Sequence, residues 1–243
     1  MQQNDRSLKQ KLHTEKLLDG QTMVPTSLWD TRHQAEEALS GDLKAFMRLF
    51  DETFTAVDQC IERLEGLDDP FGRVCALVLI KARNLGLGCY SLSLEALAQE
   101  AGALFRPLIE CLELLTYFRL DPPRINEALE DRLPKAGCIA KRIEGKFKGL
   151  RDYLNTHASH LSLSPEAMMH LVDFNAGRLR PVQVHNTVVL RQNLVTLLAV
   201  LIWLAIEAVN CTSVGACVVD DTLCDNVENI KRRALLLFDG QVE

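Results

Sequence analysis

The residue types best suited to acid–base and phosphate chemistry gather between positions 135 and 160. Arg151 precedes His157 by six residues, and His160 follows three residues later, so that both imidazoles could point to one side of a helix. Imidazole transfers protons near neutral pH, and a guanidinium stabilises negative charge on a phosphate. A basic stretch leads into this region and could follow a phosphate backbone; its cations are Lys135, Lys141, Arg142, Lys146 and Lys148, against a single acid, Glu144.

Other catalytic and ligand-binding patterns are absent from the sequence. His157 and His160 form an HxxH pair, whereas a structural zinc site needs four ligands and a catalytic one needs three with a water. The chain has no HExxH, no paired ExxH motifs, no GxSxG and no Walker loop. We therefore expect no metal and no cofactor, and histidines that are hydrogen-bonded near a helix end.

A second candidate site is the pair Arg106 and Glu110, which stand four residues apart on one flank of a predicted helix. Glu113 and Tyr117 continue the same flank. Two interpretations are open. The flank is either a solvated face with an ion pair worth roughly 0.2–0.5 kcal/mol, or a partly buried pair that fixes a polar centre inside a helical bundle.

The helix that carries this flank is predicted over residues 93–119. Ser93 can cap its start, and Asp121, which two prolines follow, marks its end. Pro107 lies in the middle of the pattern, so that the helix either kinks there or restarts at that residue. The apolar side chains recur at steps of three and four and predict one buried face: Leu94, Leu97, Ala101, Leu104, Leu108, Cys111, Leu115 and Phe118.

The remaining elements also have a helical period, and nothing predicts a sheet. Residues 1–24 read as a mobile tail, and residues 25–243 as a single all-α bundle of about seven or eight helices. The most apolar run, 194–206, is shorter than a membrane span needs and is predicted to be the central core helix. Another helix, whose start is marked by Asp68-Asp69-Pro70 ahead of the apolar stretch from Val74, should loosen at Gly86 and Gly88, and Asp220 or Asp221 should open the last helix. A short helix is predicted from Ser164 to Gly177.

Composition limits the class of protein. The chain has 243 residues, 47% of them hydrophobic, and a net charge of −6, which argues against a general nucleic-acid coat. The polar N-terminal stretch lacks the apolar core of a secretion signal. Eight cysteines include no CxxC pair and several lie in apolar periods. We therefore expect free thiols, a reducing compartment and a cytoplasmic protein that does not span a membrane.

The motif Arg151-Asp-Tyr-Leu-Asn-Thr-His157 resembles the signature of HEPN domains, an arginine and a polar residue followed by a histidine. HEPN domains are helical bundles, and many are metal-independent ribonucleases whose site forms where two copies meet. The resemblance implies that Arg151 would stabilise phosphate charge and that His157 would handle the proton of the attacking 2′-hydroxyl. The bound RNA would then run along Lys141, Arg142, Lys146 and Lys148.

The motif Leu104-Phe-Arg-Pro-Leu-Ile-Glu110 resembles the R-P-L-x-E helix of bacterial helical families of unknown function. In those families a Tyr-x-x-Leu segment and a histidine often follow. Tyr153, with either His157 or His160, would be the counterpart here, although Asn155 stands where a serine is common. The resemblance implies that Arg106, Glu110 and a histidine converge, and it implies no activity.

Two classes of function follow. The first is a non-catalytic interaction or regulatory protein that forms a homodimer and uses Arg106 and Glu110 as a structural polar lock. The second is a HEPN-like endoribonuclease of the toxin or phage-defence type that uses Arg151 and His157. The second class requires both residues to be exposed and to face their copies across a two-fold axis.

Overall fold

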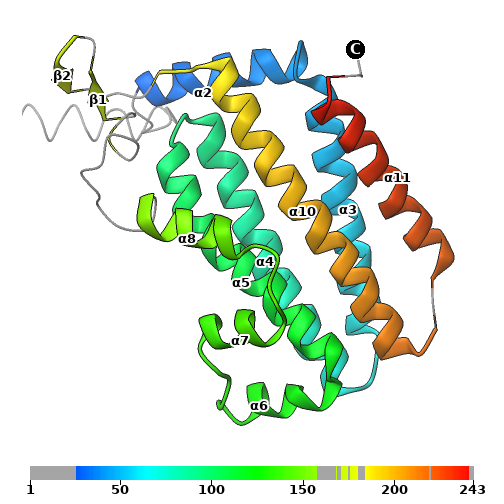
Figure 1. Ribbon diagram of the computed structural model, residues 1–243. Helices are drawn as coiled ribbons and strands as arrows, with labels where there is room; N and C mark the ends of the chain where they lie inside the picture. Colours follow the sequence, from blue (N-terminus) through cyan, green and yellow to red (C-terminus); the bar gives the residue numbers. More distant parts are fainter. Residues whose placement is uncertain are drawn as a thin grey trace, which may run out of the picture.

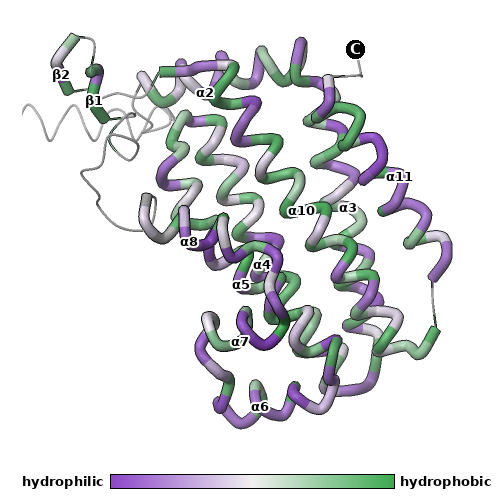
Figure 2. The backbone as a smooth tube through the Cα atoms, in the orientation of Figure 1, coloured by the Kyte–Doolittle hydropathy of each residue, from purple (hydrophilic) through white to green (hydrophobic). Residues whose placement is uncertain are grey.

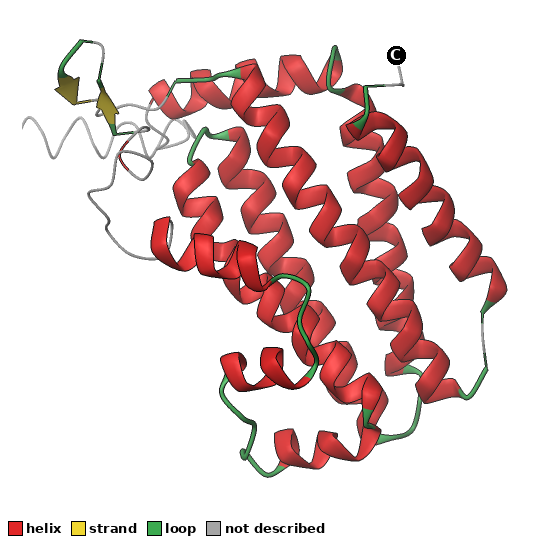
Figure 3. Cartoon of the chain, viewed as in Figure 1, coloured by secondary structure: helices red, strands yellow, loops and turns green. Residues whose placement is uncertain are grey.

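The computed structural model describes residues 26–157, 168, 171–174, 176–179, 184–218 and 220–240. Within these residues the chain forms helices joined by short connections, with one small hairpin (Figures 1 and 3). The elements are α2 (Thr26–Ser40), α3 (Lys44–Glu65), α4 (Pro70–Leu94), α5 (Ala98–Leu120), η1 (Pro122–Arg124), α6 (Ile125–Leu129), α7 (Ala136–Arg142), α8 (Lys148–His157), β1 (Val172–Asp173), β2 (Arg178–Leu179), α10 (Thr187–Ala216) and α11 (Asp221–Phe238). The all-α prediction is confirmed in its main feature. The predicted tail, residues 1–24, lies outside the described residues.

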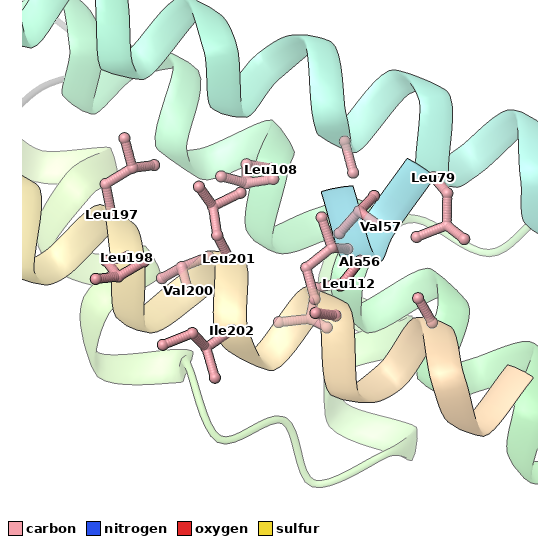
Figure 4. Packing of buried hydrophobic residues seen from close by; sticks show 14 of the residues in the cluster. Ala56, Val57, Leu79, Leu108, Leu112, Leu197, Leu198, Val200, Leu201 and Ile202 are labelled. Carbon is pink, nitrogen blue, oxygen red and sulfur yellow. The ribbon is translucent and has the colours of Figure 1, made fainter. Parts of the chain in front are cut away.

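Helix α10 is the centre of the bundle, because it packs against α2, α3, α4, α5 and α11. Its side chains at 194, 197, 198 and 201 are all leucines and all fully buried. In Figure 4, Leu201 of α10 lies beside Leu108 of α5, and Leu79 of α4 lies near Val57 of α3. The described helices from α2 to α11 all contribute to this core.

Two described helices, α4 and α10, are long and apolar enough to cross a membrane by length and composition alone. The core helix of a globular protein passes the same test, and 67% of the most apolar window of α10 is buried inside the bundle. The corresponding window of α4 is only 39% buried. The predicted cytoplasmic location stays a prediction.

The predicted start of the long helix at Ser93 is wrong. Ser93 lies inside α4, and its hydroxyl donates to the Cys89 carbonyl at 2.8 Å rather than capping a new helix. The chain turns at Ala96, whose φ of 58° ends α4 in the left-handed conformation, and α5 begins at Ala98. Pro107 then lies within α5, which continues without a break to Leu120.

The predicted loosening of α4 at its two glycines is also wrong. The helix runs through both, and Gly86 serves close packing, because a Cβ there would lie 2.8 Å from Cδ2 of Leu201 on α10. Gly86 therefore makes room for the neighbouring helix α10 and does not mark a bend in α4.

The prediction of seven or eight helices and no sheet needs two corrections. The described chain has more helices, because the region after α5 divides into the short helices α6, α7 and α8. It also has a two-stranded antiparallel hairpin, in which Val172 pairs with Leu179. The hairpin lies in the stretch where a helix was predicted. Asp173 accepts a hydrogen bond from the Ala176 amide at 3.0 Å, and Gly177 has a φ of +61°, so turn chemistry overrides the helical pattern.

Helices α6, α7 and α8 form an excursion of residues 125–157, which we call the outer segment. It packs on α5 through α7 and α8, and on α4 through α6. Figure 1 shows it on the side of α5 away from α11, and Figure 2 shows hydrophilic residues along much of it. The outer segment covers the flank of α5 that carries the predicted polar residues.

Candidate functional site

The candidate site lies between α5 and the outer segment. Arg106, Glu110, Glu113 and Tyr117 follow one another along α5 at steps of four, three and four, which places them on one flank. Helix α8 packs against this flank and brings Arg151 to it. The flank is therefore covered by protein along much of its length.

The strongest contact in the site is an ion pair between α8 and α5. Nη1 of Arg151 donates a hydrogen bond to Oε2 of Glu113 at 2.5 Å. The Glu113 side chain is only 3% exposed and that of Arg151 14%. A charge-assisted contact in so dry a place is among the stronger polar contacts that a protein makes, and removing one partner leaves the other charge buried.

The second oxygen of Glu113 is enclosed. Its Oε1 is buried and has no hydrogen-bond partner among the described residues. The α7–α8 turn closes over it at Gly145, where a Cβ would come within 2.6 Å of this oxygen. Glycine is the residue that lets the turn approach a buried carboxyl so closely.

Burial raises the pKa of the Glu113 carboxyl above its ordinary value, although Arg151 acts in the opposite direction. The nearby carboxylate of Glu110 adds to the rise by like-charge repulsion. Desolvation is the larger effect. The Glu113 carboxyl therefore takes up a proton more readily than a carboxyl on the protein surface does.

Arg106 and Glu110 form the outer part of the site. Nε of Arg106 donates to Oε1 of Glu110 at 3.0 Å, and both side chains are partly exposed. Together with Gly137, Arg151 and Asp152 they line a cavity of about 180 Å³. The structure thus places three sequence-predicted residues, Arg106, Glu110 and Arg151, around one small polar cavity.

A second cavity of about 260 Å³ lies on the other side of Glu110. Apolar side chains dominate its walls, which Glu110 and Glu113 complete; the apolar ones are Pro107, Cys111, Leu114, Leu133, Pro134, Ala136 and Ile139. It separates α5 from the connection between α6 and α7. Because Oε1 of Glu113 is buried, the orphan oxygen does not open into either cavity.

Further along the flank, Tyr117 anchors the outer segment a second time. Its ring is fully buried, and its hydroxyl donates to Oε2 of Glu127 at 2.9 Å and accepts from Nη1 of Arg142 at 2.8 Å. The guanidinium of Arg124 lies over the ring, 4.3 Å from its centroid. Burial, and then the bond to Glu127, raise the pKa of the Tyr117 hydroxyl.

The other predicted site residues are Tyr153, His157 and His160. Tyr153 is exposed on α8, while Leu154 beside it is buried. His157 is the last residue of α8, but its side chain lies outside the described ones, and so does the whole of His160. The convergence of a histidine with Arg106 and Glu110 stays a prediction.

The predicted basic approach is partly occupied by contacts within the protein. Arg142 is bonded to Tyr117, and Nζ of Lys146 lies 4.4 Å from the centroid of the Trp203 ring on α10. Lys141 and Lys148 are exposed. RNA binding by this stretch stays a prediction.

The importance of Glu113 was not predicted from the sequence. This residue was predicted to share the flank of Arg106 and Glu110, without a role of its own. The available signal was its place three residues after Glu110 and four before Tyr117. Its partner stands 38 residues away in the chain, so that no local pattern connects the two.

No group of three or more histidine, cysteine, aspartate or glutamate side chains gathers to hold a metal among the described residues. Comparison of the chain with protein-family models, with curated proteins and with solved structures found no match.

Proposed function

We propose that this protein is a non-catalytic interaction or regulatory module that acts in the cytoplasm as a homodimer. In this proposal the polar residues of α5 hold the outer segment against the bundle and perform no chemistry. The observation that carries the proposal is the pair of Arg151 and Glu113, which ties α8 to α5 by a buried charge-assisted bond.

The same pair argues for a positioning role and against a catalytic one. A catalytic arginine has to present its donors to a phosphate in the active site. Arg151 is 14% exposed and spends one donor on Glu113. The Glu113 carboxyl beside it is buried, and this burial raises its pKa.

Two further observations support the class of protein. All eight cysteines are free, which agrees with a reducing compartment. Helix α4 also exposes leucine and isoleucine side chains on its outer face, and apolar faces of this kind mark surfaces that bind partners.

A cleavage assay distinguishes this proposal from the alternative, a HEPN-like metal-independent endoribonuclease. Purified wild-type protein and the His157→Ala variant are incubated with a mixed-sequence RNA in the presence of a chelator. We expect equal background cleavage by both proteins. Cleavage by the wild type that His157→Ala abolishes, while folding and oligomeric state stay unchanged, would establish the nuclease and overturn the proposal.

A further inference from the structure

The outer segment leaves space unfilled where it meets α5. Two cavities, of about 180 and about 260 Å³, are each lined by residues of both. The buried Oε1 of Glu113, which has no hydrogen-bond partner among the described residues, lies at the same interface. Protein interiors are normally packed to the density of an organic crystal, and a gap forfeits the dispersion contacts that would fill it. The interface between the outer segment and α5 is therefore packed less completely than the leucine core around α10.

The outer segment also buries few apolar side chains. Among its described residues they are Ile125, Ile139, Ala140 and Leu154. Helix α10 alone buries side chains in every turn from Leu190 to Thr212. Since hydrophobic stabilisation is roughly proportional to the apolar area removed from water, the outer segment is held far less strongly than α10. Segments with few buried apolar contacts open while the rest of a protein stays folded.

Glu113 of α5 holds two consecutive parts of the outer segment. It accepts the hydrogen bond of Arg151 on α8, at 2.5 Å, and the turn between α7 and α8 closes over it at Gly145. If α8 moved away alone, this turn would still cover the Glu113 carboxylate, which would be buried without its partner. A buried charge without a partner is strongly destabilising. Separate opening of α8 is therefore disfavoured.

Tyr117, one helical turn further along α5, likewise holds two parts of the outer segment. Its hydroxyl donates to Glu127 of α6 and accepts from Arg142 of α7, and its ring is fully buried. If α6 moved away alone, the hydroxyl would lose its acceptor while α7 still enclosed it. A buried donor without an acceptor is costly. Opening of the whole outer segment avoids both costs, because it brings the Tyr117 hydroxyl and the Glu113 carboxylate into water.

We propose that the outer segment is a lid that opens as one unit while the bundle of α2–α5, α10 and α11 stays folded. Opening uncovers an apolar strip of α5 that lines the larger cavity and consists of Pro107, Cys111 and Leu114. The inference rests on the holding role that the proposed function gives to the polar residues of α5. It adds that these residues release α6, α7 and α8 together, which gives the module a closed and an open state.

Native-state hydrogen exchange at low urea concentrations, measured by mass spectrometry of peptides from the full chain, tests the lid. Three single variants are compared with the wild type. Arg151→Ala removes the bond to Glu113, and Tyr117→Phe removes the hydroxyl but keeps the ring. Ile230→Val is the control, because Ile230 is 1% exposed on α11, which packs on α3 and α10 away from the outer segment (Figure 1).

In the wild type we expect the amides of α6, α7 and α8 to exchange through one opening with a small urea dependence. The amides of α10 should exchange through global unfolding, which depends steeply on urea. Arg151→Ala should accelerate exchange about 30-fold in α6 and α7 as well as in α8, and Tyr117→Phe about fivefold in the same three helices. Ile230→Val should accelerate exchange in α10 about fivefold and leave the outer segment unchanged, because the contacts of Ile230 stay formed when the lid opens.

Acceleration by Arg151→Ala in α8 alone, with the effect of Tyr117→Phe confined to α6 and α7, would show that the helices open separately. The lid would then be overturned, while the holding role of the polar residues would stand. If Ile230→Val accelerates the outer segment and α10 alike, the outer segment opens only with the whole bundle, and the lid is overturned as well. If neither Arg151→Ala nor Tyr117→Phe alters exchange in the outer segment, the holding role and the lid fail together.

Discussion

Removing the arginine of the buried pair Arg151–Glu113 is the sharpest test of whether this pair holds the outer segment on α5. Arg151→Ala leaves Glu113, which is 3% exposed, without its only described partner. Breaking a buried pair in this way costs about 3–5 kcal/mol when the remaining charge stays fully buried and ionised. Here the cost is lower, because Arg151 is partly solvated and Glu113 can take up a proton. We expect a loss of about 2–3 kcal/mol near pH 8.

The pH dependence of this loss has a definite sign. Below the ordinary carboxyl pKa of 4.5, Glu113 is protonated in both the folded and the unfolded chain, so that the charge contributes nothing. Burial raises the folded pKa, and Arg151 lowers it, so its removal raises the folded pKa further. The penalty of Arg151→Ala therefore grows as the pH rises above 4.5 through the folded pKa, and it is smallest in acid.

The assay must separate detachment of the outer segment from global unfolding, because the two need not occur together. Urea unfolding at pH 4 and pH 8 gives the global free energy. Hydrogen exchange of the α8 amides gives the local one, where about 2 kcal/mol corresponds to a roughly 30-fold faster exchange. Arg106→Ala is the control, since its partly exposed i,i+4 pair with Glu110 should contribute only about 0.2–0.5 kcal/mol.

The reasoning would be refuted by an Arg151→Ala protein that matches Arg106→Ala in both assays. A loss that is the same at pH 4 and pH 8 would also contradict it, since the effect would then come from packing of the arginine stem rather than from the buried charge. Glu113→Gln serves as a second check. The glutamine keeps an acceptor for Arg151 but cannot be charged. In this background the loss of stability caused by Arg151→Ala should differ little between pH 4 and pH 8.

Two further predictions concern glycine and cysteine positions. Gly145→Ala should destabilise the protein by about 1–3 kcal/mol in urea unfolding, because its Cβ would lie 2.6 Å from Oε1 of Glu113. Gly149→Ala is the control: its Cβ would have open space, and the substitution should be neutral or stabilising by up to about 1 kcal/mol. Equal changes in the free energy of unfolding for the two variants would contradict the contact between the turn at Gly145 and Glu113. Cys138 is exposed and should react with a maleimide at pH 8 within minutes. Cys89 is buried, which raises its pKa to about 12, and it should react only on unfolding. Fast labelling of Cys89, detected by mass spectrometry of its peptide, would contradict the packing of α4 against α5.

Much of the fold could be predicted because the signals are local. Asp69 and Asp220 are of the residue type that caps helix starts, and each carboxylate does accept a backbone amide of its helix, at 2.7 Å from Gly72 and at 2.9 Å from Leu223. The central place of α10 followed from its continuous apolar sequence. A capping residue or an apolar run carries its meaning within a few residues of itself.

The errors arise where tertiary contacts decide between local alternatives. Ser93 has the chemistry of a cap, yet its hydroxyl bonds backward to Cys89 because the turn falls at Ala96. Gly86 resembles a helix breaker, yet it is the space that Leu201 needs. The Leu201 side chain belongs to another helix, so the sequence around Gly86 does not show this contact.

The candidate site was predictable in part for the same reason. The flank of Arg106 and Glu110 is a repeat along one helix and could be read from the sequence. The pairing of Glu113 with Arg151 joins two helices 38 residues apart, and only the path of the outer segment brings them together. Helix periodicity places residues on a face, but it does not say what covers that face.

The mass of the full chain in solution tests the central claim most directly. Light scattering on the eluting peak of a size-exclusion column, run at several loading concentrations, should give a mass that rises toward twice that of one chain. A wild-type mass that stays at one chain at every loading would contradict the homodimer, and with it the account of this protein as a module that works by self-association.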